Sequence, residues 1–191
     1  MFKNQATHAN NSKYGIIDSN LSRNHANIFD INETNYSSVL THGDKILDFL
    51  EKYENSYSFY YYIAEENNHI SSAKLLDGLK WMLKNEVKFV CISLSSKYYS
   101  EDLQSWILEN KDQITVYASY NNVINDLDYP AKYEGVIGIG SSLKIKKKKE
   151  DIIYKNSKII LISNGFYYFN GNSFLAPYTM LKSTMHNRLD K

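Results

Sequence analysis

The chain has little of what several classes of protein require. It has a single cysteine, Cys91, in the strand-like run KFVCISL. An internal disulfide is therefore excluded, and we expect Cys91 to be a small buried apolar residue of a protein kept in a reducing compartment. No window approaches the roughly 18 consecutive apolar residues of a membrane span. The polar start MFKNQATHANNSKY lacks the apolar core of a secretory signal, which favours a cytoplasmic location without membrane contact.

The chain also has almost no excess charge. Its net charge of +1 over 191 residues gives no general reason to expect nucleic acid or a membrane surface as a partner. Its five histidines and scattered acids show no metal-ligand spacing, so we expect no metal and no cofactor. The one charge run is KIKKKK at 144–149, followed at once by Glu150 and Asp151. For this run we favour a solvated loop over a patch for an acidic partner.

Enough apolar sequence is present for one core. With 43% apolar residues and no internal repeat, we expect a single domain over 1–191, in which residues 1–12 form a flexible N-terminal segment. The polar stretch 19–38 is typical of a surface loop. Strands are expected at 13–18, 56–64, 88–94, 114–119, 135–140 and 158–163, and helices at 41–53, 71–86, 100–110 and from Ser173 onward. Their alternation predicts a parallel sheet with helices on both faces and a site at the carboxyl ends of the strands.

The stretch NGNSFLAPY at 170–178 carries the first candidate for chemistry. A Gly-x-Ser step leads into residues with helical spacing, so Ser173 is expected to open a helix. A hydroxyl there sits at the positive end of the helix dipole, beside unpaired backbone N–H groups that can stabilise an oxyanion. Taken alone, such a serine is far more often an ordinary helix cap.

Two further polar residues stand at the ends of expected elements. Asp18 ends the first strand, and His42 lies in Thr-His-Gly at the start of a helix. Singly, the aspartate is more often a turn former and the histidine a surface residue. Together with Ser173 they occur in the order Asp, His, Ser, which is the order of the subtilisin triad.

Several segments carry a resemblance to one family. Gly-x-Ser-Phe-x-Ala-Pro at 171–177 strongly resembles the nucleophile segment of subtilisin-like serine proteases, GIIDSNL at 15–21 the aspartate segment, and THGDKI at 41–46 the histidine segment. In the last only His-Gly is matched, because Asp44 and Lys45 replace the usual Thr-His. Three more blocks, at 74–94, 114–122 and 129–142, resemble the family's following segments in order. The chain thus looks like a short and divergent member of the family, matched from about Tyr14 to Met185.

The resemblance implies a fold and an assignment of roles. The fold is α/β, with three layers and a mostly parallel central sheet flanked by helices, truncated at the C-terminus relative to typical members. Ser173 would be the nucleophile, His42 the general base and Asp18 its orienting partner. The Asn121 side chain and the Ser173 N–H would form the oxyanion hole. The Tyr129–Pro130 bond is expected to be cis by the same resemblance.

The departures from the family pattern concern the substrate cleft. The strands that pair with an extended substrate would lie at Asn68-His69-Ile70 and at Ser93-Leu94-Ser95, where Ser95 replaces a glycine. Substrate contacts are therefore expected from His69, Ser93, Leu94 and Ser95. Tyr120 replaces a glycine of the pocket for the residue before the scissile bond, and its ring is expected to fill or narrow that pocket. Asn172 replaces a threonine, which is expected to alter a second possible oxyanion donor without abolishing it.

Two kinds of function fit these residues. The favoured one is a serine endopeptidase that binds an extended peptide or protein substrate, with narrow specificity for a precursor or leader peptide. The alternative is a catalytically weak or inactive scaffold of the same fold that binds a peptide or a protein partner. An esterase or transacylase would use the same triad with another acyl acceptor. The 17 tyrosines are expected in the core and on the surface rather than along a substrate groove.

Overall fold

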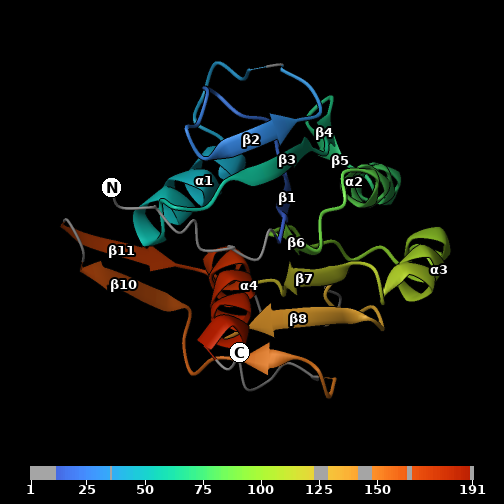
Figure 1. Cartoon of the computed structure of the whole chain (residues 1–191). Coiled ribbons are helices and arrows are strands. Elements are labelled where there is room, and N and C mark those ends of the chain that lie inside the picture. The colour runs from blue at the N-terminus through green and yellow to red at the C-terminus, as the bar shows by residue number, and fades with distance from the viewer. Residues whose placement is uncertain (1–11, 35, 123–128, 142–147, 163–164, 190–191) are drawn as a thin grey trace, which may run out of the picture.

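A seven-stranded parallel sheet forms the centre of the computed structural model, which describes residues 12–34, 36–122, 129–141, 148–162 and 165–189 (Figure 1). The strand order is β2-β3-β1-β6-β7-β8-β9, and every neighbouring pair is parallel. The strands are β1 (Tyr14–Asp18), β2 (Ile28–Ile31), β3 (Phe59–Ile63), β6 (Phe89–Ile92), β7 (Thr115–Ser119), β8 (Val136–Gly140) and β9 (Ile152–Ile153). Because all are parallel, their carboxyl ends meet at one edge of the sheet.

Helices cover both faces of this sheet. Helices α1 (His42–Tyr53) and α4 (Asn172–Leu189) lie on one face, and α2 (Ser72–Lys84) and α3 (Glu101–Asn110) on the other (Figure 1). Alternation along the strands supplies both cores: Ile16 packs with α1 and α4, whereas Ile17 packs with α2 and α3. The predicted three-layer α/β fold with a mostly parallel sheet is confirmed. None of the described helices is both long and apolar enough to cross a membrane.

Side-chain caps fix where the helices begin. Thr41 caps α1 and forms a capping box with Asp44, while Ser71 and Ser100 each accept a bond from a backbone N–H at the start of α2 and α3. Each cap satisfies an N–H that has no partner inside the helix. These starts lie where the sequence predicted them, because caps are local signals.

Two predictions about strands were wrong. The expected loop at 19–38 contains β2, a short, partly exposed edge strand that pairs with β3. Residues 158–163 were expected in the parallel sheet, but β10 (Lys158–Ile162) pairs antiparallel with β11 (Phe166–Asn170) in a separate hairpin. The connection between these two runs is too short for the crossover that parallel pairing requires. A second small hairpin joins β4 (Glu65–Glu66) to β5 (His69–Ile70).

Two local predictions are confirmed. Cys91 is fully buried in β6, where burial raises the pKa of its thiol to about 12, so the thiol stays protonated at neutral pH. The Tyr129–Pro130 peptide bond is cis. Tyrosines also fill the core as expected, among them the fully buried Tyr61.

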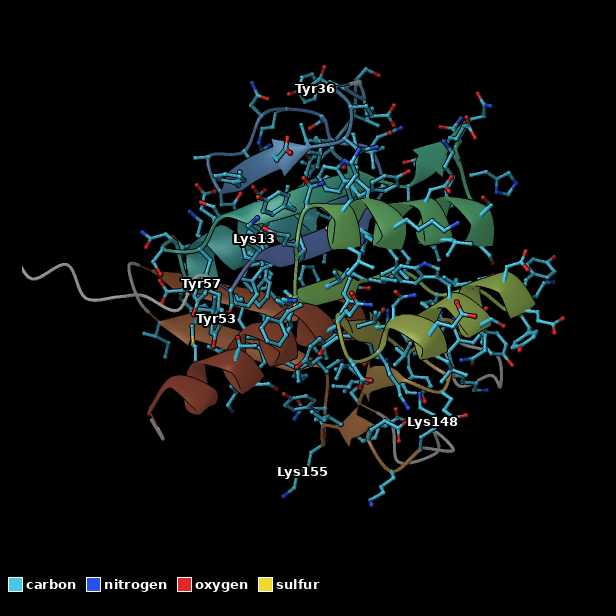
Figure 2. The ribbon with its side chains drawn as sticks, turned by 45° about the vertical axis from the view of Figure 1, so that its right-hand side comes forward. Lys13, Tyr36, Tyr53, Tyr57, Lys148 and Lys155 are labelled. Atoms are coloured by element: carbon cyan, nitrogen blue, oxygen red, sulfur yellow. The ribbon has the colours of Figure 1, made fainter. Side chains whose placement is uncertain are left out.

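The lysine run gave a further correction. Residues 142–147 lie outside the described part of the chain, but Lys148 is not solvated: its side chain is only 22% exposed. The ammonium donates to the carbonyl oxygens of Ala131, Tyr133 (2.8 Å) and Val136 (2.9 Å), and lies 3.3 Å from the Asp151 carboxylate. Burial lowers the pKa of Lys148 despite this carboxylate. Figure 2 shows Lys148 beside the end of the sheet formed by β8 and β9. Composition alone does not distinguish this lysine from its neighbours.

We expect Lys148→Met to lower the free energy of unfolding by about 3 kcal/mol, because it leaves the buried Asp151 carboxylate and the carbonyl oxygens without their cation. The neighbouring Lys149 is exposed, so Lys149→Met should change stability by less than about 0.5 kcal/mol. Urea unfolding of the two variants and the parent measures both values. Equal stability of the two variants would contradict the structural role of Lys148.

Candidate active site

Asp18 and His42 meet at the carboxyl edge of the sheet. Asp18 is the last residue of β1 and fully buried, and His42 is the first residue of α1. The His42 Nδ1 lies 2.8 Å from Asp18 Oδ1. Since a carboxylate only accepts, neutral His42 must carry its proton on Nδ1, which leaves Nε2 as the basic nitrogen.

The surroundings of the pair favour a charged histidine. Burial alone would lower the pKa of His42, but the hydrogen bond and the negative charge of Asp18 outweigh it, so the pKa is raised above its ordinary value. Asp18 Oδ1 also accepts from the Ser19 N–H at 2.7 Å. The second oxygen, Oδ2, is buried and has no hydrogen-bond partner among the described residues. Unsatisfied acceptors of this kind are rare in folded proteins and occur at functional sites.

Ser173 lies in the first turn of α4, as predicted. Its backbone N–H is among those that a helix leaves without an internal partner. Pro177, four residues on, has no N–H to give to the Ser173 carbonyl, and the buried Ser93 hydroxyl donates to it instead at 3.0 Å. The start of α4 is thereby tied to the end of β6, because Ser93 directly follows that strand.

Asn172 ties the same helix start to the segment after β7. Its side-chain amide donates to the Tyr120 carbonyl at 3.0 Å and to the Asn121 carbonyl at 2.9 Å, and its oxygen accepts from Ser141 at 2.8 Å. Both amide hydrogens are therefore used, and Asn172 is only 2% exposed. The expectation that Asn172 preserves a second oxyanion donor was wrong. Asn121 itself is exposed, and its backbone lies next to the residue that precedes Ser173.

The predicted residues lie at one edge of the sheet and are held by three separate contacts, but among the described residues no hydrogen bond joins His42 to Ser173. Asp18 bonds His42, Ser93 bonds Ser173, and Asn121 is bonded by the neighbour of Ser173. The helices that carry His42 and Ser173 pack together, with the rings of Phe49 and Phe174 at 5.6 Å between centroids.

A pocket of about 550 Å³ lies beside this edge. His69, Leu94 and Ser95, which were predicted to contact substrate, all line it. Ser93 does not, because its side chain is 2% exposed and committed to Ser173. The remaining lining is largely apolar and aromatic: Ile70, Ser71, Ser72, Leu75, Ser96, Tyr98, Leu103, Tyr129, Pro130 and Tyr133. Three tyrosines therefore line a pocket, which the sequence analysis had disfavoured.

Tyr120 was also predicted to contact substrate, but the structure buries it. The ring is 1% exposed and its hydroxyl donates to the Asp151 carboxylate at 2.6 Å. It therefore occupies space inside the protein rather than lining an accessible surface. Asp151 was expected only as the acidic end of a charge run, and no pattern in the sequence indicated its contact with Tyr120.

Asp44 is a second residue whose role the sequence did not show. It is fully buried in the first turn of α1 and accepts from the Ser22 N–H, from Thr41 and from His25 Nε2. Burial alone would raise the pKa of Asp44, but these bonds lower it far below its ordinary value. The carboxylate therefore anchors the loop before β2 to the helix that carries His42. Its only sequence signal was the Thr-x-x-Asp capping pattern.

Comparisons with known proteins found likeness at the level of structure alone. No family model matches the chain, and no curated protein matches it. Among solved structures, the prenylagaramide maturation protease PagA is similar with a TM-score of 0.62 and 16% identity over 88% of this chain and 72% of that one. A cold-adapted subtilisin-like serine proteinase is similar with a TM-score of 0.65 and 14% identity, over 89% of this chain and 72% of that one. The patellamide maturation protease PatA is similar with a TM-score of 0.63 and 16% identity, over 87% of this chain and 74% of that one. At these identities the likeness concerns the fold.

Proposed function

We propose that this chain, whose fold is that of the subtilisin-like proteases, is a serine endopeptidase in which Ser173 is the nucleophile, His42 the general base and Asp18 the residue that orients the base. One observation carries the proposal: a fully buried carboxylate lies 2.8 Å from Nδ1 of a partly exposed histidine. This contact makes Nε2 the nitrogen that takes a proton.

In the proposed reaction the Ser173 hydroxyl attacks the carbonyl carbon of a peptide bond. As the new C–O bond forms, the hydroxyl proton passes to His42 Nε2, and the carbonyl oxygen becomes an oxyanion that accepts from the Asn121 amide and the Ser173 N–H. When the C–N bond breaks, His42 returns the proton to the leaving amine. Water then attacks the acyl-enzyme with its proton taken by the same histidine, which releases the acid and restores Ser173.

The position of Ser173 at the start of α4 supports this role. The Asn172 N–H donates to Asn122 Oδ1 and the Phe174 N–H to the Gly171 carbonyl, whereas the Ser173 N–H between them has no such bond among the described residues. It carries the partial positive charge of a helix start, which favours an oxyanion beside it. The Ser93 hydroxyl donates to the Ser173 carbonyl, so the turn that bears the nucleophile is fixed to the end of β6. Preorganised donors of this kind need no rearrangement when charge develops.

The proposed substrate is an extended segment of a precursor or leader peptide. Leu94, Ser95 and His69 border the apolar pocket, which has the size and lining to take an apolar side chain of a peptide that runs along the sheet edge. Two of the similar structures are maturation proteases. Narrow specificity for such a peptide is part of the proposal, and degradation of unrelated denatured proteins at comparable rates would contradict it.

A fluorophosphonate probe tests the proposal, because it forms a bond only with a serine that its neighbours activate. The expected result is one adduct in the folded parent chain, located at Ser173 by mass spectrometry, with none in the Ser173→Ala variant and none in denatured parent. A folded parent without adduct would favour the alternative, a peptide-binding scaffold without chemistry.

A further inference from the structure

Three hydrogen bonds to described residues hold Tyr120, the residue before Asn121. Its N–H donates to the Ile139 carbonyl at 2.8 Å, its carbonyl accepts from Asn172 at 3.0 Å, and its hydroxyl donates to Asp151 at 2.6 Å. The first two contacts use the backbone. The third links the hydroxyl of the buried ring to Asp151, which directly precedes β9. It therefore fixes the direction in which the backbone runs into Asn121.

Asp151 is built as an anchor for this hydroxyl. Its side chain is fully buried and also accepts from the Gly138 N–H at 2.9 Å and the Lys148 N–H at 2.7 Å. The ammonium of Lys148, 3.3 Å away, supplies the opposite charge. Groups of the β8 and β9 region therefore hold both carboxylate oxygens, in addition to the bond from the Tyr120 hydroxyl.

Gly138 provides the space in which the ring lies. A Cβ at this position would stand 2.5 Å from Tyr120 Cε2 and 2.7 Å from Asp151 Oδ1, closer than real contacts allow. A glycine in a strand marks such close approach. The tyrosine, the glycine and the carboxylate therefore fit together as one unit in the interior of the protein.

We propose that Asp151, acting through Tyr120, is a positioning residue that holds Asn121 where its amide meets the oxyanion. This inference rests on the function proposed above for Ser173 and Asn121. A group held about 1 Å out of place can cost a hundredfold in rate, and losing an oxyanion donor costs about a hundred- to a thousandfold. Loosening one hydrogen bond of Tyr120 should cost less, about tenfold in kcat.

Three variants test the inference: Tyr120→Phe, Asp151→Asn and the double variant. With a p-nitrophenyl ester, we expect kcat to fall about tenfold in each single variant, with KM changed less than about twofold. The double variant should be no slower than Asp151→Asn, because the two groups act through one contact. The rate of fluorophosphonate labelling should fall in parallel.

Tyr14→Phe is the matched control. Tyr14 is also a buried tyrosine with a hydroxyl bond, to Thr184 at 3.1 Å, but it lies at the amino end of β1, away from the site. The Tyr14→Phe variant should lose about as much stability as Tyr120→Phe and keep the parental kcat. Parental kcat in the Tyr120→Phe and Asp151→Asn variants, or additive losses in the double variant, would overturn the inference.

Hydrogen exchange gives a readout that needs no activity. The Tyr120 amide, bonded to Ile139, should exchange faster in both single variants and stay at the parental rate in Tyr14→Phe. If the parent chain fails to react with the probe, the proposed function fails, and the exchange rates alone decide whether Asp151 holds this segment. Unchanged exchange in both variants would overturn that role as well.

Discussion

A Ser173→Ala variant is expected to hydrolyse peptides about a millionfold more slowly than the parent chain, a magnitude taken from subtilisin itself. Removing the hydroxyl removes the acyl-enzyme route, and the remaining oxyanion donors stabilise only direct attack by water. The structure predicts little damage to the fold, since the contact that ties Ser173 to β6 uses its carbonyl rather than its side chain. Initial rates on a fluorogenic peptide library, measured for both proteins, check the prediction.

Ser56→Ala is the control for this experiment. Ser56 is exposed in the loop between α1 and β3, and its replacement should leave the rate at the parental level. Ser173→Ala should also keep the parental unfolding midpoint in urea, so that a lost rate reports lost chemistry. A Ser173→Ala protein that cleaves peptides as fast as the parent would show that another group carries any hydrolysis.

Much of the fold could be predicted because its signals are local. The helices begin at Thr41, Ser71 and Ser100, where a capping side chain precedes an apolar periodicity. The buried strands are continuous apolar runs, which parallel sheets require. Strand β2 escaped prediction because an edge strand needs few buried residues, and β10 was misplaced because an apolar run does not state which sheet it joins.

The candidate site divides in the same way. The places of Asp18, His42 and Ser173 in the fold could be predicted, because each lies where an expected element ends or begins. Their roles stay a prediction that rests on the order of the three residues and on the resemblance. The contacts that fix the segments around the site could not be predicted. The Asn172 side chain bonds Asn121, 51 positions away, and the Tyr120 hydroxyl bonds Asp151, 31 positions away. Such bonds depend on where side chains point after the sheet has formed. No spacing in the sequence encodes that direction.

We expect Asp18→Asn to lower kcat by about ten-thousandfold, the loss known for the equivalent change in a Ser-His-Asp protease. An aspartate accepts from His42 Nδ1, whereas the amide of asparagine can donate to it. That donation would leave the proton on Nε2, where it blocks removal of the Ser173 proton. Asp30→Asn, at an exposed position of β2, is the matched control and should keep the parental kcat. Parental activity in Asp18→Asn would exclude this aspartate from the reaction.

The pH dependence of the rate tests the same contact independently. The base must be neutral, so kcat/KM should rise with pH through the pKa of His42 in the free protein. Asp18 stabilises the protonated imidazole more than burial opposes it, and the pKa of His42 is raised, which places this rise above the ordinary histidine value of about 6.5. Replacing Asp18 by asparagine removes the negative charge and leaves the burial, so the midpoint of the residual activity should move to lower pH. A midpoint that stays in place, or that rises, would mean that Asp18 does not set the charge of His42, and the 2.8 Å contact between them would then be structural rather than catalytic.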